Sequence, residues 1–116
     1  MAYIKRYCGR YLYEINNGRI KEYCGSYLFD FDGRYFKRYC GPYLYEVVND
    51  RYIKEYCGGY LYEFDGHYLK RYCGSYQYEV VNGRYIKEYC GSYLYEIDGN
   101  LSKSELFAVL MLLFVR

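Results

Sequence analysis

The sequence predicts a mainly β protein: a closed antiparallel β-barrel of about twelve short strands that encloses a C-terminal hydrophobic α-helix. Three observations support this fold class. One hairpin motif recurs throughout residues 1–99, turn residues separate its strands at even spacing, and an apolar segment follows the last repeat. At 116 residues, the chain is expected to form a single domain over residues 1–116.

Three segments, 1–33, 34–66 and 67–99, each end in Asp-Gly and align with one another. The third reads HYLKRYCGSYQYEVVNGRYIKEYCGSYLYEIDG, and the first matches it except that it lacks one tyrosine. Each segment contains the motif twice, once as KRYCG and once as KEYCG. The chain therefore consists of six half-repeats with a pseudo-threefold pattern, as in repeat architectures.

Each half-repeat contains two runs rich in Tyr, Ile and Val, residues that favour strands. Cys-Gly bounds the runs on one side, and Asp-Gly or Asn-Gly bounds them on the other. Asp-Gly and Asn-Gly favour two-residue hairpin turns, in which both central residues have positive φ. The VVND and VVNG versions carry one more residue, which predicts a longer turn or a bulge. Twelve antiparallel strands follow, four in each segment.

Pairing the strands across each turn assigns every side chain to one of two faces. One face has an apolar or aromatic residue at both central positions in all six copies, while the other has a lysine at its centre. The first is expected to point inward, because mid-strand lysines do not belong in a core. On this pairing Tyr11 lies on the inward face, and Leu12 lies opposite Lys5 on the outer face. The inward central pairs are Ile4–Tyr13, Ile20–Phe29, Phe36–Tyr45, Ile53–Tyr62, Leu69–Tyr78 and Ile86–Tyr95.

Residues 100–116 are expected to form a capped hydrophobic helix. Ser102 and Glu105 form a capping-box signature, and no residue from Leu106 to Val115 is polar. Such a run is shorter than the ~20 residues needed to span a bilayer. A barrel of this strand number has room for a helix about 10 Å across, and an even strand number allows antiparallel closure. The helix is therefore expected to enter at the Asp-Gly rim and to finish near the cysteine rim.

Two alternatives remain open at this stage. The repeats could coil as a β-solenoid, although this would stack identical charges and separate the turns from their hairpins. The helix could instead insert shallowly into a bilayer.

The predicted barrel resembles a known architecture. Twelve antiparallel strands around a hydrophobic C-terminal helix are similar to the tubby C-terminal and scramblase-like fold, and the YLYEIDG hairpins resemble the bacterial β-flower-type repeat domains. The resemblance covers nearly the whole chain and implies this fold. Tubby-like domains are associated with phosphoinositide binding, but the chain has no matching basic lipid-binding motif, so no site residues are carried over.

All six cysteines lie in YCG motifs, and the barrel would place their turns at one rim. One interpretation is that these small side chains seal the end of the core. A thiolate metal site and a redox or disulfide role are alternatives, but no CxxC motif supports a metal site, and His67 lies near the opposite rim. No cofactor is expected. The cysteines are Cys8, Cys24, Cys40, Cys57, Cys73 and Cys90.

Six charged residues just inside that rim alternate in sign around the barrel mouth. They are Arg6, Glu22, Arg38, Glu55, Arg71 and Glu88. One interpretation is an ion-pair network that fixes strand register. The other is a binding site for an anionic or polar ligand at the mouth, with the arginines as the binding groups.

No nucleophile with a base, phosphate loop or metal-ligand set stands out from the repeat, so an enzyme is not expected. The formal charge of +2 and the carboxylates beside the outer lysines argue against nucleic-acid binding. A chain start without an apolar signal core predicts a cytoplasmic protein. We expect a non-enzymatic structural or protein-interaction module, with an unknown protein partner or self-association through a tyrosine-rich outer face. The alternative is a ligand- or membrane-associated module that uses the mouth or the helix.

Overall fold

The computed structural model describes residues 1–116, which form twelve strands followed by one helical segment. The helical segment consists of α1 (Lys103–Leu110) and the π-helical turn η1 (Met111–Val115). The strands are β1 (Ala2–Arg6), β2 (Tyr11–Asn16), β3 (Arg19–Glu22), β4 (Tyr27–Phe31), β5 (Tyr35–Arg38), β6 (Tyr43–Val48), β7 (Tyr52–Glu55), β8 (Tyr60–Phe64), β9 (Tyr68–Arg71), β10 (Tyr76–Val81), β11 (Tyr85–Glu88) and β12 (Tyr93–Asp98).

The strands form a closed antiparallel barrel in which each strand pairs with its neighbours in sequence. The ring closes between β1 and β12, where Ile4 lies opposite Ile97 and Lys5 lies opposite Glu96. This closure confirms the predicted barrel and is incompatible with a β-solenoid. It leaves no strand edge open for pairing with another chain.

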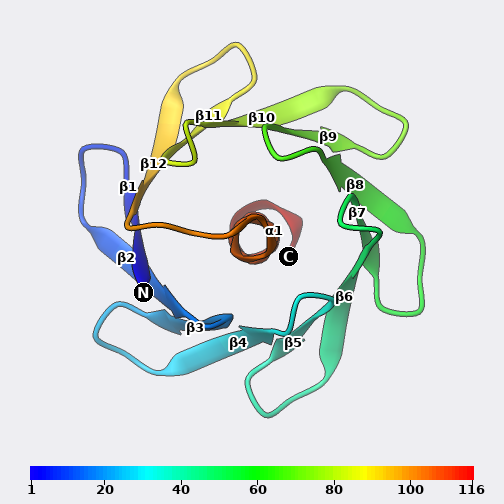
Figure 1. Cartoon of the computed structure of the whole chain (residues 1–116), viewed down its shortest axis with the longest axis horizontal. Coiled ribbons are helices and arrows are strands. Elements are labelled where there is room, and N and C mark those ends of the chain that lie inside the picture. Colours follow the sequence, from blue (N-terminus) through cyan, green and yellow to red (C-terminus); the bar gives the residue numbers. More distant parts are fainter.

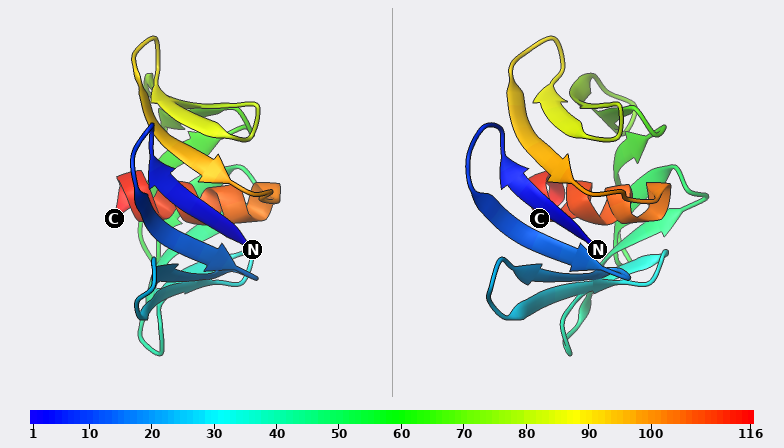
Figure 2. Two further views of the ribbon diagram at one scale, coloured as in Figure 1. Left: turned by 90° about the vertical axis from the view of Figure 1, so that its left-hand side faces the viewer. Right: turned by 60° about the vertical axis from the view of Figure 1, so that its left-hand side comes forward.

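The molecule is a flat ring, with extents of 37 × 34 × 19 Å. Figure 1 shows the six Cys-Gly hairpin ends projecting outward around the ring, with the helical segment seen end-on at its centre. The helical segment therefore runs along the short axis of the ring, and the side views show it crossing the ring from one face to the other (Figure 2).

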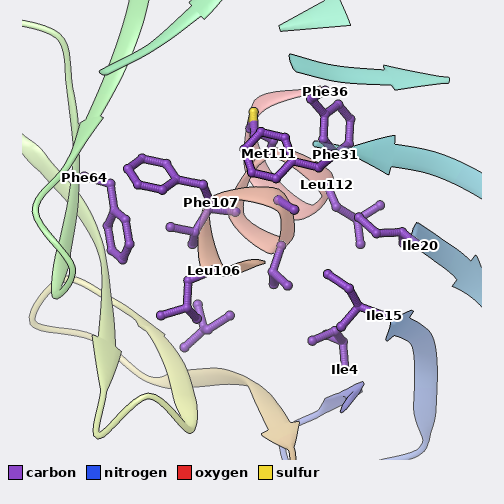
Figure 3. Close-up of a cluster of buried hydrophobic side chains, with 14 of the residues drawn as sticks. Ile4, Ile15, Ile20, Phe31, Phe36, Phe64, Leu106, Phe107, Met111 and Leu112 are labelled. Atoms are coloured by element: carbon purple, nitrogen blue, oxygen red, sulfur yellow. The ribbon is translucent and has the colours of Figure 1, made fainter. Parts of the chain in front are cut away.

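The hydrophobic core contains residues from every part of the ring and from the helix. The predicted inward residues Ile4, Phe36 and Ile53 are fully buried, as are their equivalents in the other hairpins. Phe107 on α1 packs edge-on against Phe64 on β8, with ring centroids 5.2 Å apart, and Figure 3 shows these side chains pointing toward each other. Each fully buried side chain of this size contributes about 1.5–3 kcal/mol. The helix thus supplies the centre of the core.

The predicted capping box is present at the start of α1. The Ser102 side chain accepts from the backbone N–H of Glu105, and the Glu105 carboxylate accepts from the Ser102 N–H. A change to π-helical geometry at Met111 has no signal in the apolar sequence and was not expected. Neither α1 nor η1 is long and apolar enough to cross a membrane.

The turns opposite the Cys-Gly loops follow the sequence only in part. Asn17 and Gly18 both have positive φ, as expected for a two-residue turn. Val48 pairs with Tyr52, which leaves Asn49–Arg51 in between and confirms the longer turn expected from VVND. The Asp-Gly turns differ, because only the glycine has positive φ. The Asp32 carboxylate instead accepts hydrogen bonds from the backbone N–H groups of the two residues after Gly33.

A β-bulge in every Cys-Gly hairpin corrects the predicted faces near the cysteine rim. Ile4 lies opposite Tyr13 as expected, but Lys5 lies opposite Tyr11 and not Leu12. The extra residue of a bulge changes which face the following side chains point to. Tyr11 therefore joins the outer face, where its ring centroid lies 5.2 Å from that of Tyr3. The equivalent leucine of β4, Leu28, packs against the core.

Candidate functional site

The Cys-Gly loops have the same unusual backbone conformation in all six hairpins. Every cysteine has a positive φ, between 53° and 56°, and every cysteine is exposed and unpaired. Glycine or asparagine is the usual residue for this conformation. Because the loops project away from the barrel (Figure 1), the thiols cannot seal the core, and that interpretation was wrong.

The glycine after each cysteine has a steric role. The Gly9 N–H donates to the Arg6 carbonyl at 2.8 Å, which closes a tight turn. A Cβ at Gly9 would lie 2.9 Å from the Arg6 Cβ, and the five equivalent glycines show contacts of 2.8–2.9 Å. Such a contact requires neighbouring atoms to move, so any larger residue at this position would be strained.

His67 does not approach the cysteines. Its Nε2 lies 3.1 Å from a Glu79 carboxylate oxygen on the outer wall. No group of three or more His, Cys, Asp or Glu side chains is arranged to hold a metal ion.

Tyrosine clusters surround the outer wall. Five clusters contain three tyrosines each, with ring centroids 4.9–6.0 Å apart. In one, Tyr72 from the β9–β10 turn packs on Tyr52 of β7 and Tyr60 of β8, so the cluster joins two hairpins. In the sixth cluster only Tyr27 and Tyr39 meet, and the Arg19 guanidinium carbon lies 5.9 Å from the Tyr27 ring centroid. Arg19 stands where the first segment lacks a tyrosine.

Eleven of these tyrosines have exposed fractions of 40–45%, and we call them the tyrosine rim. In five of the hairpin turns, the neighbouring cysteine raises the pKa of the tyrosine that precedes it; Tyr72 beside Cys73 is one example. With the pKa raised above its ordinary value, these five phenol groups stay protonated at neutral pH and can donate hydrogen bonds. The rim consists of Tyr7, Tyr23, Tyr27, Tyr39, Tyr43, Tyr56, Tyr60, Tyr72, Tyr76, Tyr89 and Tyr93.

Ion pairs lie beside the tyrosine clusters on the outer wall, with cations such as Arg34 over a cluster ring. Glu46 lies between Arg34, with oxygen and nitrogen 2.9 Å apart, and Lys54 at 3.8 Å. Glu63, Glu79 and Glu96 each lie between two basic side chains in the same way. The outer wall therefore presents aromatic surface with little net field.

The six alternating charges are the C-terminal residues of the odd-numbered strands. Each lies opposite an aromatic residue of an even-numbered strand. None of the six takes part in an ion pair, so the predicted ion-pair network is wrong. One strand separates each charge from the next, a spacing of ~10 Å, which is too far for direct pairing. The charged side chains at the mouth are exposed and free to meet a ligand.

A pocket of about 430 Å³ opens at this mouth. It brings together two of the six predicted charges, Glu22 and Arg38, whereas the other four lie outside it. Sequence reasoning missed the remaining lining residues. Of these, Phe29 carried a signal, because it is the one residue without a hydroxyl among the six aromatic positions of the mouth. The lining residues are Leu12, Tyr13, Glu22, Leu28, Phe29, Arg38 and Arg116.

Comparison with known proteins identifies no relative. No family model, curated protein or solved structure matched the chain. The resemblance to β-flower-type and tubby-like domains therefore stays a prediction, and function has to be argued from the molecule itself.

Proposed function

We propose that the chain is a non-enzymatic protein-interaction module that binds a protein partner through the tyrosine rim. The observation that carries this proposal is the rim itself: eleven tyrosines, each 40–45% exposed, held on one closed ring. Tyrosine is enriched in protein interfaces and in binding loops, because its ring offers a large, amphipathic contact area with few torsions to immobilise.

The surroundings of the rim favour a protein surface over a nucleic acid. Outer-wall lysines such as Lys54 and Lys87 lie within 4 Å of a carboxylate, which weakens attraction to phosphate. Ring contacts within each cluster restrain the tyrosines before binding, which reduces the entropy lost on association. We further propose a reducing compartment such as the cytoplasm, where six exposed thiols remain unpaired.

Peptide selection tests this function without a known partner. Peptides selected from a displayed random library on the full chain would be titrated against a variant in which Tyr27, Tyr43, Tyr60, Tyr76 and Tyr93 are changed to serine. We expect binding to weaken by more than about tenfold, in the range found for aromatic interface residues. Lys103→Ser, on the opposite rim, should bind as the parent does, and a melting curve of the serine variant would show that it is still folded.

A second measurement needs no substitution. The ring-proton resonances of rim tyrosines in the unaltered chain should shift when the peptide binds, while those of Tyr78, which stacks on Phe114 at the mouth, should change little. Unchanged rim resonances in the complex, or equal peptide affinity for the serine variant, would exclude the rim as the binding surface. Sedimentation at rising concentration would show whether a second copy of the chain is the partner.

A further inference from the structure

The repeat makes six equivalent positions at the barrel mouth, each with an aromatic residue opposite a charged one. Arg38 lies opposite Phe29, and Arg71 lies opposite Tyr62. In a strictly symmetric barrel, all six positions would offer the same surface. Only one cluster of these residues lines a pocket at the mouth, so something in the chain breaks the symmetry.

The end of the helical segment breaks the symmetry of the barrel mouth. Phe114 stacks on Tyr78 with centroids 3.7 Å apart and also approaches Tyr95 at 6.0 Å. The Tyr45 hydroxyl donates to the Val115 carbonyl at 3.3 Å. Residues of β6, β10 and β12 therefore meet the end of the helix, whereas Tyr13 of β2 and Phe29 of β4 border the open space.

Two guanidinium groups that pair with no Asp or Glu side chain lie at the open space. The guanidinium carbons of Arg116 and Arg38 lie 5.0 Å and 6.0 Å from the Phe29 ring centroid. Neither arginine takes part in an ion pair, although nine pairs of a lysine or arginine with a carboxylate form elsewhere in the molecule. Glu22 is the single acidic side chain of the lining, so the lining side chains carry a formal charge of +1.

The other lining residues are apolar. The bulges of the first two hairpins place Leu12 and Leu28 beside the pocket, and Phe29 presents a ring without a hydroxyl. The volume of about 430 Å³ falls in the range of small-molecule sites. A ligand that fits must combine an apolar, planar part with one negative charge.

We propose that this mouth pocket binds a small aromatic monocarboxylate, with its carboxylate between Arg38 and Arg116 and its ring against Leu12, Leu28 and Phe29. A guanidinium matches a carboxylate through two parallel hydrogen bonds. Glu22 disfavours a second negative charge on the ligand, which selects against phosphate. This site is separate from the tyrosine rim, and the inference does not depend on the proposed protein-binding function.

Three probes separate the contributions of charge and ring. Benzoate carries both, benzyl alcohol carries the ring alone, and inorganic phosphate carries charge alone. Each would be titrated into the labelled full chain, with backbone amide shifts as the readout. Benzoate should bind about tenfold more tightly than either other probe, with the largest shifts at Leu28, Phe29 and Arg38.

A matched pair of variants tests the residues. Arg38→Gln should weaken benzoate binding about tenfold, the effect of losing a charge-assisted hydrogen bond. Arg71→Gln removes the equivalent arginine outside the pocket and should leave the affinity unchanged. Both side chains are exposed, so neither change should unfold the barrel, and melting temperatures would verify this.

Three results would overturn the proposal. They are the absence of saturable shifts with benzoate, equal weakening by the two arginine variants, and phosphate or benzyl alcohol binding as tightly as benzoate. Each of these results is independent of whether peptides bind the tyrosine rim.

Discussion

In the Cys-Gly loops, the two residues carry different constraints. The cysteine takes the positive φ that a glycine would normally supply, whereas the following glycine has no room for a side chain. A left-handed conformation costs a non-glycine residue roughly 1–2 kcal/mol, and the loops carry this cost six times. Neither the positive φ of the cysteine nor the lack of space at the glycine was predicted from the sequence, because Cys-Gly is not a standard turn pair.

Adjacent glycines in one loop provide a direct test of the steric role. A Cβ at Gly58 would lie 2.8 Å from the Glu55 Cβ, whereas a Cβ at Gly59 would meet nothing within 4 Å. Gly58→Ala should lower the free energy of unfolding by about 1–3 kcal/mol, as overpacking does. Gly59→Ala should leave it unchanged or raise it by a few tenths of a kcal/mol. Urea unfolding measures both, and equal effects of the two changes would refute the steric explanation.

Asp65 gives the barrel a pH dependence in acid. Its burial raises the carboxyl pKa, but hydrogen bonds from the backbone N–H groups of Tyr68 and His67 outweigh this, and the pKa lies below its ordinary value. A carboxyl with a lowered folded-state pKa stabilises the fold above its unfolded pKa, and this contribution disappears as the pH falls through the folded value.

Asp65→Ala should therefore be less stable than the parent at pH 7, by about 1 kcal/mol for the lost hydrogen bonds. The difference should begin to shrink below about pH 4, the ordinary carboxyl pKa, and should disappear as the pH falls through the lower pKa of the folded state. Melting curves between pH 2.5 and 7 measure this. A difference that stays constant over the whole range would contradict the role given to the charged carboxylate.

The hairpin is the unit that the sequence predicts best. Its two inward residues and its Asn-Gly turn follow from alternation and turn chemistry, as Ile20, Phe29 and Gly18 illustrate. The bulge beside Tyr11 was missed, because simple alternation contains no signal for one extra residue inside a strand. That residue decides which tyrosines reach the outer wall and which leucines reach the mouth.

The tyrosine clusters should hold neighbouring hairpins together. Tyr72 contacts two tyrosines of the preceding hairpin, Tyr52 and Tyr60, while Tyr39 at the equivalent position contacts only Tyr27. Aromatic pairs contribute about 0.5–1.5 kcal/mol beyond their buried area. Tyr72→Ala should therefore destabilise the protein more than Tyr39→Ala, by about 0.5–1.5 kcal/mol in chemical unfolding. If Tyr39→Ala costs as much or more, the second ring contact has no energetic role.

At the scale of the whole molecule, closure and the central helix depend on each other. Twelve strands leave a lumen that side chains of the strands alone do not fill, and a helix apolar on all sides needs such a lumen. This matching of lengths and faces made the barrel predictable from the sequence. The mouth pocket was not predictable, because it depends on the direction of the Phe114 side chain within the π-helical turn, and the local sequence there is uniformly apolar.

The enclosure of the helix is most directly tested by through-space methyl contacts in the nuclear magnetic resonance spectrum of the full chain. Methyl groups of Ala108, Val109 and Leu110 should show contacts to strands on opposite sides of the ring, and Ile4 should show cross-strand contacts to Ile97 at the closing seam. Helix contacts to strands on one side only, or the absence of contacts between β1 and β12, would contradict a closed barrel built around its C-terminal helix.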